Sequence, residues 1–180
     1  MIYAFLADGF EEIEAVTVID ILRRAGREVV SVGIGGKNVR GAHGITVNAD
    51  IDDSAAVLDE KLEMVFLPGG MPGTINLEKS EFVQKALDYC AANDRYIAAI
   101  CAAPSVLGHK GILEGKKASC YPGFEKELRG ANVSFDAVSV DGKIITSRGP
   151  ATAVAMGLEL AEIFTSREDA SKLGEGMICM

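Results

Sequence analysis

Short, continuously apolar segments alternate with helix-like segments along this sequence, and that alternation limits the possible folds more than any other feature. Four apolar segments suit buried strands, at Ile2–Leu6, Glu28–Val32, Met64–Leu67 and Ile97–Ile100. Strands that are apolar on both faces need helices on both sides of their sheet. The sequence therefore predicts an α/β, flavodoxin-like three-layer sandwich with a mainly parallel central sheet, formed as a single domain over residues 1–180.

The segments between the strands carry ordinary helix and turn signals. Helices are predicted over three segments, Glu11–Ala25, Glu81–Ala92 and Ala151–Phe164. The third is expected to be the last helix of the chain. Gly26 suits the end of the first helix, because glycine readily adopts the left-handed conformation found there. Two hairpins are expected, one within residues 33–50 and one that turns at Asp141-Gly142.

Charge and cysteine content narrow the class of partner. The 180 residues include 18 basic and 26 acidic side chains, a formal net charge of −8, without a basic cluster. Nucleic acid needs concentrated positive charge, so neither nucleic acid nor a membrane surface is expected as a partner. The apolar N-terminus is interpreted as a first strand rather than a signal peptide. The four cysteines have neither metal-ligand nor paired spacing, so we expect reduced thiols in the cytoplasm, no metal and no cofactor.

Cys101 stands at the end of a predicted strand. Two alanines, a proline and the helix-like segment Ser105–His109 follow it. This is the layout of a nucleophile elbow, a strand-to-helix turn that exposes one side chain above a parallel sheet. The N-terminus of the following helix would stabilise a thiolate there. A buried structural cysteine fits the segment equally well, because free cysteine is among the most buried residue types.

Glu14 lies on an apolar stripe of the predicted first helix. It shares a face with Val18 and Ile21, because residues about one turn apart are neighbours on a helix surface. Burial of an unpaired carboxylate is costly, so the pKa of Glu14 is expected to rise until the group can donate a proton. The alternative is that the side chain reaches solvent at the helix end. Glu11 and Glu12, in the first turn, are expected to be solvated.

Two adjacent glycines, Gly69 and Gly70, follow the predicted strand Met64–Leu67. Glycines at a strand end allow bare backbone N–H groups to point at a ligand. Together with the N–H of Ala102, they are candidates for an oxyanion hole. An ordinary turn is the alternative, and only the position of the pair at a strand end favours the functional interpretation.

The two histidines are poorly placed for a catalytic triad. His109 follows Cys101 by eight residues on the same predicted helix, which separates them by roughly 12 Å. His43 lies in the glycine-rich hairpin and would reach Cys101 only through folding or from another subunit. A Cys-His-Asp triad within one subunit is therefore not supported, and a pair formed by Cys101 and Glu14 remains.

Five motifs, in order along the chain, resemble the ThiJ/PfpI superfamily. They are Gly9–Glu14, Asp20–Gly26, Leu67–Gly70, Ala98–Pro104 and Thr146–Pro150. The resemblance covers almost the whole chain and is closest to the subgroup of the human parkinsonism protein and its bacterial relatives. It implies a homodimer with a reactive, oxidation-sensitive Cys101 and a protonated Glu14 against that thiol. The backbone donors would come from three residues, Gly69, Gly70 and Ala102.

The chain departs from this resemblance at two positions. Many members carry a histidine before a proline near the site, whereas this chain has Tyr121 there. Close relatives have an arginine in the hairpin at the position of His43. We expect His43, with Arg24, to edge the site of the partner subunit, and a solvated loop histidine is the alternative. The resemblance assigns the segment of Arg148 to support of the dimer and of the cysteine loop.

These features together favour a cofactor-independent cysteine enzyme that acts on small dicarbonyls such as methylglyoxal, as glyoxalase and deglycase relatives are credited with doing. Cys101 would attack the aldehyde and Glu14 would move protons as the adduct rearranges toward lactate. The alternative function is a redox sensor or chaperone-like stress protein that works through oxidation of Cys101. A peptidase or amidase ranks third, because the histidine that such branches use is missing.

Overall fold

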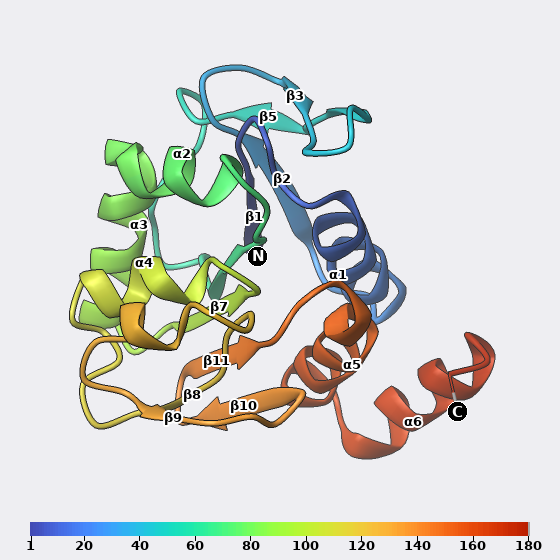
Figure 1. Cartoon of the computed structure of the whole chain (residues 1–180). Coiled ribbons are helices and arrows are strands. Elements are labelled where there is room, and N and C mark those ends of the chain that lie inside the picture. The colour runs from blue at the N-terminus through green and yellow to red at the C-terminus, as the bar shows by residue number, and fades with distance from the viewer. Residues whose placement is uncertain (180) are drawn as a thin grey trace.

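The structure, a computed structural model, describes residues 1–179 and is organised around a seven-stranded sheet (Figure 1). The strand order is β10-β11-β7-β6-β1-β2-β5. The strands are β1 (Ile2–Leu6), β2 (Val29–Gly33), β5 (Ile51–Asp52), β6 (Met64–Leu67), β7 (Tyr96–Ile100), β10 (Val138–Asp141) and β11 (Ile144–Ser147). Every neighbouring pair is parallel except β10 with β11. The predicted mainly parallel, flavodoxin-like sheet is thus confirmed.

Helices cover both faces of the sheet, as the continuously apolar strands require (Figure 1). One face carries α1 (Glu12–Arg24) and α5 (Ala153–Phe164); the other carries α2 (Gly73–Lys79), α3 (Glu81–Ala92) and α4 (Pro104–His109). Side chains alternate between the faces along each strand. On β1, Ile2 and Ala4 pack in the core on the α1 and α5 side, whereas Phe5 packs in the core on the α3 side. No helix within residues 1–179 is long and apolar enough to cross a bilayer.

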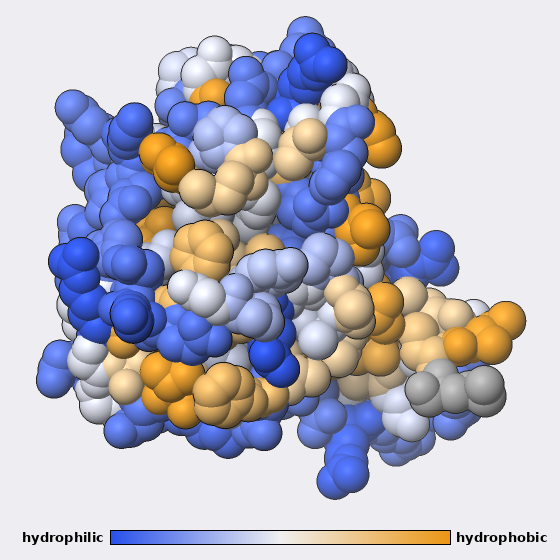
Figure 2. Space-filling view, viewed as in Figure 1, coloured by the Kyte–Doolittle hydropathy of each residue, from blue (hydrophilic) through white to orange (hydrophobic). Residues whose placement is uncertain are grey.

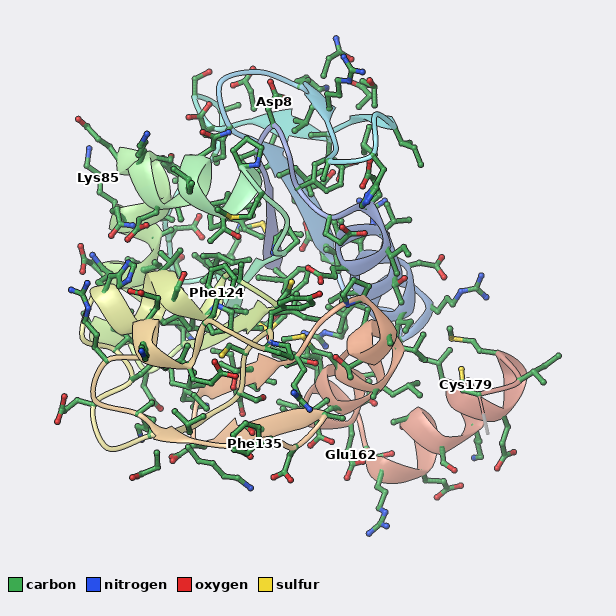
Figure 3. The ribbon with its side chains drawn as sticks, in the orientation of Figure 1. Asp8, Lys85, Phe124, Phe135, Glu162 and Cys179 are labelled. Carbon is green, nitrogen blue, oxygen red and sulfur yellow. The ribbon has the colours of Figure 1, made fainter. Side chains whose placement is uncertain are left out.

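The predicted hairpin within residues 33–50 consists of β3 (Asn38–Arg40) and β4 (Thr46–Asn48), which pair antiparallel. Asp8, which follows β1, accepts a hydrogen bond from the Arg40 N–H at 2.9 Å and ties the hairpin to the sheet (Figure 3). A further pair of short strands follows α4, β8 (Lys117–Ala118) and β9 (Asn132–Val133). One 3₁₀ turn lies between these two strands, at Glu125–Glu127, and a second follows β11, at Pro150–Thr152.

The expectation that the last helix ends near Phe164 is wrong, because α6 (Arg167–Gly176) follows it. The sequence of α6 is polar apart from a few residues, which lie on one face of the helix. Ser166 caps its start, because the Ser166 hydroxyl accepts a hydrogen bond from the Asp169 N–H at 3.1 Å. Ala170 and Leu173 then join a small apolar cluster with α1 and α5. A cap and a few small contacts thus position a helix whose low overall hydrophobicity hides it in the sequence.

Candidate active site

Four adjacent strands, β11, β7, β6 and β1, bring their carboxyl ends to one edge of the sheet. The register pairs Ser147 with Ile100 and Leu67 with Ala99. The loops that follow these strands therefore meet, as expected where ligands bind in open α/β sheets. This edge collects Cys101 and the loop that begins at Gly69, both singled out from the sequence.

Cys101 forms the sharp turn between β7 and α4. Its φ is 65°, in the left-handed region, which costs a residue with a side chain roughly 1–2 kcal/mol. Two hydrogen bonds hold this backbone: the Cys101 N–H donates to the Ser147 carbonyl at 3.0 Å, and the Tyr121 N–H donates to the Cys101 carbonyl at 2.8 Å. The side chain is half-buried. Such an imposed conformation is typical of a side chain that is held for a task.

Glu14 is completely buried on the sheet-facing side of α1. Its Oε2 accepts a hydrogen bond from the Gly69 N–H at 2.8 Å. Within residues 1–179, its Oε1 is buried without a partner of ordinary hydrogen-bond geometry, although the Cys101 thiol lies close enough to act on Glu14 as a donor. An unsatisfied buried oxygen is costly. A proton on this carboxyl, directed at the sulfur, would satisfy it.

The two glycines of the β6 loop have different tasks. The Gly69 N–H bonds to Glu14, so Gly69 is not a free oxyanion donor as the sequence suggested. A Cβ at Gly69 would lie 2.6 Å from the Cys101 Cβ, so only glycine lets the thiol and the carboxyl approach. The N–H groups of Gly70 and Ala102 lower the pKa of the Cys101 thiol, so they are the backbone donors near the sulfur.

Burial raises the pKa of Glu14 to about 7, and the Glu11 charge adds to this rise while the Cys101 thiol and the Gly69 N–H oppose it. Burial, followed by the Glu14 charge, raises the pKa of Cys101 to about 12 despite the backbone donors. The thiolate expected from the helix N-terminus is therefore not favoured, because burial and a carboxylate outweigh a six-residue helix. The two groups act as a coupled pair that shares a proton.

Glu11 and Glu12 are buried rather than solvated, because the hairpin covers the first turn of α1. Glu12 accepts hydrogen bonds from the backbone N–H groups of His43 and Ile45, at 2.8 and 3.3 Å. The exposed His43 imidazole lies 3.0 Å from Glu12 and 3.5 Å from Glu11. This cluster is the group within residues 1–179 with metal-ligand spacing. Its carboxylates and imidazole already pair with one another.

Of the other predicted site residues, Tyr121 and Arg148 lie near Cys101, whereas Arg24 lies far from His43. Arg24 pairs with Asp20 at 2.6 Å in the last turn of α1, roughly 18 Å from the helix start, so the structure does not bring it to His43. Tyr121 lies beside Cys101 and its ring faces Gly149. Arg148 lies 5.8 Å from the centre of the exposed Phe135 ring and, among the residues described, its buried Nε has no partner. Tyr121 and Arg148 thus border the cysteine loop.

Sequence reasoning did not single out Ser147 within the motif Thr146–Pro150, yet its carbonyl holds the Cys101 N–H. Its hydroxyl donates to the Ala137 carbonyl at 2.7 Å and lies 2.7 Å from the Thr152 hydroxyl, so the strand end is fixed. The sequence does contain a signal for Ser147, because this residue ends an apolar segment of the strand type. The order of neighbouring strands, which the sequence does not state, was the missing piece.

His109 is turned away from the cysteine and joins three segments behind the site. Its Nδ1 lies 2.6 Å from Glu78 of α2 and its Nε2 lies 2.8 Å from Glu127 of the first 3₁₀ turn. Because both ring nitrogens face carboxylates, both should carry protons. These contacts raise the pKa of His109, mainly through Glu127. Lys110 and Arg129 are the nearby cations, and they pair with Asp88 and Glu127.

His109→Gln is expected to destabilise the protein at pH 5.5 by about 1 kcal/mol and to have less effect at pH 8.5. A raised folded-state pKa contributes stability that is complete below the ordinary histidine value of 6.5 and disappears as pH rises through the folded value. Urea unfolding of both proteins at the two pH values measures this difference. An equal loss at both pH values would show that the imidazolium pairs contribute nothing.

The fold and the Cys101 turn define a doubly wound α/β domain with a cysteine above the carboxyl edge of its sheet. The chain belongs to the DJ-1/PfpI family, whose sequence profile matches residues 1–163.

Relatives and solved structures agree with this assignment. The chain is 36% identical to Drosophila melanogaster protein dj-1beta over 176 residues, covering 96% of this chain and 94% of that protein. It is 32% identical to a Pyrococcus abyssi protein named a deglycase, covering 87% and 95%. It spans only 40% of Arabidopsis thaliana DJ-1 homolog B, at 36% identity. The structure of oxidized Toxoplasma gondii DJ-1 superposes with a TM-score of 0.93 at 38% identity, covering 98% and 97%.

Proposed function

We propose that this protein is a cofactor-independent enzyme that converts small dicarbonyls, with methylglyoxal as the test substrate, into hydroxy acids. The observation that carries this proposal is the position of Glu14. Its side chain is completely buried beside the Cys101 thiol, and its Oε1 lacks a hydrogen-bond partner among residues 1–179. The name of the Pyrococcus abyssi relative supports carbonyl chemistry in the family. The proposed chemistry needs a reduced thiol, so we place the protein in a reducing compartment such as the cytoplasm.

In the proposed reaction, the Cys101 sulfur adds to the aldehyde carbon of methylglyoxal while the thiol proton passes to Glu14. The N–H groups of Gly70 and Ala102 stabilise the resulting oxyanion. Glu14 returns its proton to that oxygen and then removes the hydrogen from the former aldehyde carbon, which leaves an enediolate with its charge on the neighbouring oxygen. The hydroxyl proton passes from the first oxygen to that neighbouring oxygen. Glu14 then delivers its proton to the neighbouring carbon, and the first oxygen becomes the carbonyl of a thioester. The product is a lactate thioester on Cys101. Water hydrolyses this thioester, so methylglyoxal and water give lactate and the free thiol.

Cys101→Ser is expected to reduce the conversion of methylglyoxal to lactate to the uncatalysed background, because a hydroxyl is a far weaker nucleophile than a thiol beside this carboxyl. Lactate is measured with reduced wild-type protein whose mass has been verified. Cys179→Ser is the control, because Cys179 is also partly exposed but lies near the C-terminus. Turnover retained by Cys101→Ser would reject the proposal, as would no turnover by the wild type.

A second candidate function is redox sensing through Cys101. The sulfur is half-buried, and the N–H groups of Gly70 and Ala102 and a protonated Glu14 are placed to bond the oxygens of a sulfinic acid. Peroxide titration followed by intact mass tests this function. A sensor should gain two oxygen atoms on Cys101 at low peroxide and change its fold or its binding partners as a result.

We also propose that the protein forms a homodimer through an apolar patch made of Ile13, Val16 and Ile45. These side chains are 57%, 49% and 60% exposed. Ile13 and Val16 share one face of α1, and the Ile45 N–H bonds to Glu12 at the start of that helix. Figure 2 shows apolar surface over α1 and the hairpin along the right-hand edge of the molecule. His43 adjoins this patch, so a dimer here would place it near the partner.

The double variant Ile13→Glu/Val16→Glu is expected to be a monomer, because it introduces charges that a dimer would bury. Light scattering after size-exclusion chromatography measures the mass. Val57→Glu is the matched control, because Val57 is 60% exposed but lies between β5 and β6. A wild-type monomer, or a double variant that remains a dimer, would contradict this interface.

A further inference from the structure

His109 ends α4, the helix that begins just after Cys101, and it contacts two segments that lead back to the cysteine site. Its Nδ1 lies 2.6 Å from Glu78 of α2, and its Nε2 lies 2.8 Å from Glu127 of the first 3₁₀ turn. The imidazole is 26% exposed, so solvent screens these contacts only in part. Neither contact takes part in the proposed reaction.

A continuous series of backbone hydrogen bonds leads from Glu127 to Cys101. The Glu127 N–H donates to the Phe124 carbonyl at 2.9 Å, and the Phe124 N–H donates to the Tyr121 carbonyl at 3.1 Å. The Tyr121 N–H then donates to the Cys101 carbonyl at 2.8 Å. This last bond is one of the two that hold the left-handed Cys101 backbone, whose φ is 65°. The position of Glu127 therefore affects how firmly the strained cysteine turn is held.

Glu78 leads to the other loop at the site. In the first turn of α2, the Thr74 N–H donates to the Gly70 carbonyl at 2.9 Å, and the Gly70 N–H is a backbone donor near the Cys101 sulfur. Glu78 lies one turn further along α2, about 6 Å along the helix axis from Thr74. His109 thus connects the two loops that border the thiol.

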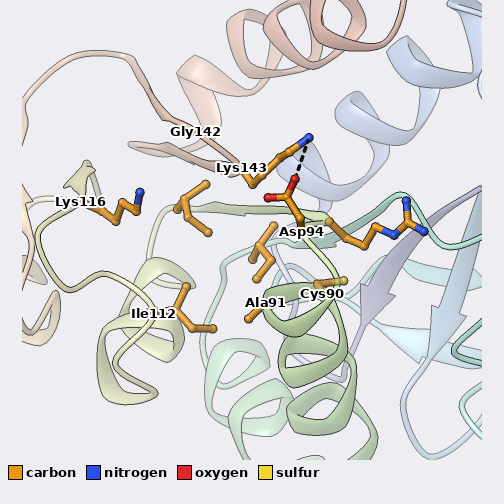
Figure 4. Close-up of a pocket in the computed structure, with 10 residues that line it drawn as sticks. Cys90, Ala91, Asp94, Ile112, Lys116, Gly142 and Lys143 are labelled. Carbon is orange, nitrogen blue, oxygen red and sulfur yellow. Dashed lines mark ion pairs between the residues drawn. The ribbon is translucent and has the colours of Figure 1, made fainter. Parts of the chain in front are cut away.

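The base of the loop that carries Tyr121 is anchored without His109. The chain after α4 first runs to the amino edge of the sheet, where Ile112 and Lys116 border a cavity of about 490 Å³ (Figure 4). Lys116 lies 3.2 Å from Asp141 there, and β8 pairs with β9 on either side of the loop. Movement that follows loss of a His109 contact is therefore confined to the turns between these two strands.

The charge of His109 decides whether both of its contacts exist. An imidazolium donates from both ring nitrogens, whereas a neutral imidazole donates from one and directs a lone pair at the other carboxylate. The nearby cations are Lys110, 2.9 Å from Asp88 of α3, and Arg129, 4.0 Å from Glu127. Glu127 is the partner that a neutral ring releases, because its contact is the longer one and Arg129 is an alternative partner.

We propose that His109 is a positioning residue for Cys101. In its protonated form it holds Glu127 and, through the turns at Phe124 and Tyr121, fixes the Cys101 carbonyl. Loss of the proton releases Glu127 and loosens the cysteine turn. The proposal rests on the proposed function only in taking Cys101 as the nucleophile, and His109 touches neither the substrate nor the reacting atoms.

Hydrogen exchange of backbone amides, followed by NMR on the full chain between pH 5.5 and pH 9.5, tests this role. Each rate is divided by that of an unstructured peptide at the same pH. His109→Gln should lower the protection of the Tyr121 amide by about threefold or more at pH 5.5, because a glutamine cannot donate to both carboxylates. The Ala42 amide, which donates to the Phe10 carbonyl in the hairpin, should be unaffected.

The wild type should lose the same protection as pH rises, with the midpoint at which the His109 ring itself titrates. This midpoint lies above 6.5, because Glu127 and Glu78 raise the pKa of His109. The ring signals of His109 in the same samples give the midpoint directly. A residue that only filled space would produce no such coincidence.

Two variants make the test specific. In Glu127→Gln, the amide can accept from an imidazolium and donate to a neutral ring, so the protection of Tyr121 should not depend on pH. Lys110→Gln is the matched control, because it removes the neighbouring cation of α4 and leaves the series from His109 to Cys101 intact. Lys110→Gln should keep the wild-type profile.

Three exchange results would overturn the proposal: unchanged Tyr121 protection in His109→Gln, an equal loss at Ala42, or a wild-type midpoint that differs from the ring titration. His109→Gln should also lower kcat for methylglyoxal by about threefold at pH 5.5 and leave KM unchanged; an unchanged kcat would count against it equally. Absence of turnover in the wild type would reject the proposed enzyme alone, since the exchange of Tyr121 still decides the role of His109.

Discussion

Glu14→Gln is expected to slow methylglyoxal turnover by about 10²-fold or more and, at the same time, to stabilise the folded protein above pH 7. A glutamine keeps an oxygen that can accept the Gly69 N–H bond, now 2.8 Å long, so the local structure should survive. It can neither take the thiol proton nor return it, so the reaction loses its acid and base. Activity and stability therefore move in opposite directions, as expected for a buried group kept for function.

The sign of the stability change follows from the pKa of Glu14. Burial raises this pKa from its ordinary value of 4.5 to about 7, so the folded state binds the proton more tightly than the unfolded state does. The associated stability is complete below pH 4.5 and disappears as pH rises through 7. Well above pH 7 the ionised carboxylate costs on the order of 3 kcal/mol. The neutral glutamine does not have this cost.

Urea unfolding of wild type and Glu14→Gln between pH 4 and pH 8.5, with lactate formation measured in parallel, tests both parts. The stability difference should grow in favour of the variant as pH increases. Glu81→Gln is the control, because Glu81 is also a first-turn acid of a helix but its side chain is 90% exposed; it should show neither effect. A stability difference independent of pH would mean that Glu14 is not the titrating group, and unchanged turnover would remove it from the reaction.

The pairing of Cys101 with Glu14 could be predicted because two strong rules converge on it. Parallel strands place their carboxyl ends at one edge, and a carboxylate on an apolar helix stripe must face the core. The direction of individual N–H groups follows no such rule. Gly69 was expected to be an oxyanion donor, yet its N–H bonds to Glu14. Two adjacent glycines show where the backbone lacks side chains, but they do not show in which direction each N–H group points.

The charges at the start of α1 show a second limit of sequence reasoning. Glu11 and Glu12 follow the ordinary pattern of solvated first-turn acids, yet both are buried. The hairpin that covers them is separated by about 30 residues in sequence, and His43 meets Glu12 only after both segments dock. Local propensity describes a helix end well, but it does not describe what a distant loop places over that end.

Gly70→Ala is expected to destabilise the protein by about 2–5 kcal/mol and to disorder the cysteine site. Gly70 has a φ of 90°, which costs an alanine roughly 1–2 kcal/mol. A Cβ there would also lie 2.4 Å from the Glu11 nitrogen and 2.5 Å from the Gly9 carbonyl oxygen. These are backbone atoms in a packed edge, so the loop must move, at a further cost of about 1–3 kcal/mol. Movement of the loop would also withdraw the Gly70 N–H from the Cys101 sulfur.

Gly35→Ala separates the backbone strain from the clash. Gly35 has a similar φ of 78°, but no atom lies within 4 Å of its Cβ position, so the substitution should cost only the roughly 1–2 kcal/mol of the left-handed conformation. Urea unfolding gives both values, and methylglyoxal turnover of the folded fraction reports on the site. Equal destabilisation by the two variants would mean that the β6 loop moves aside without cost. In that case Gly70 would be a turn residue only, and the close approach of this loop to the backbone of Gly9 and Glu11 would not be what requires a glycine.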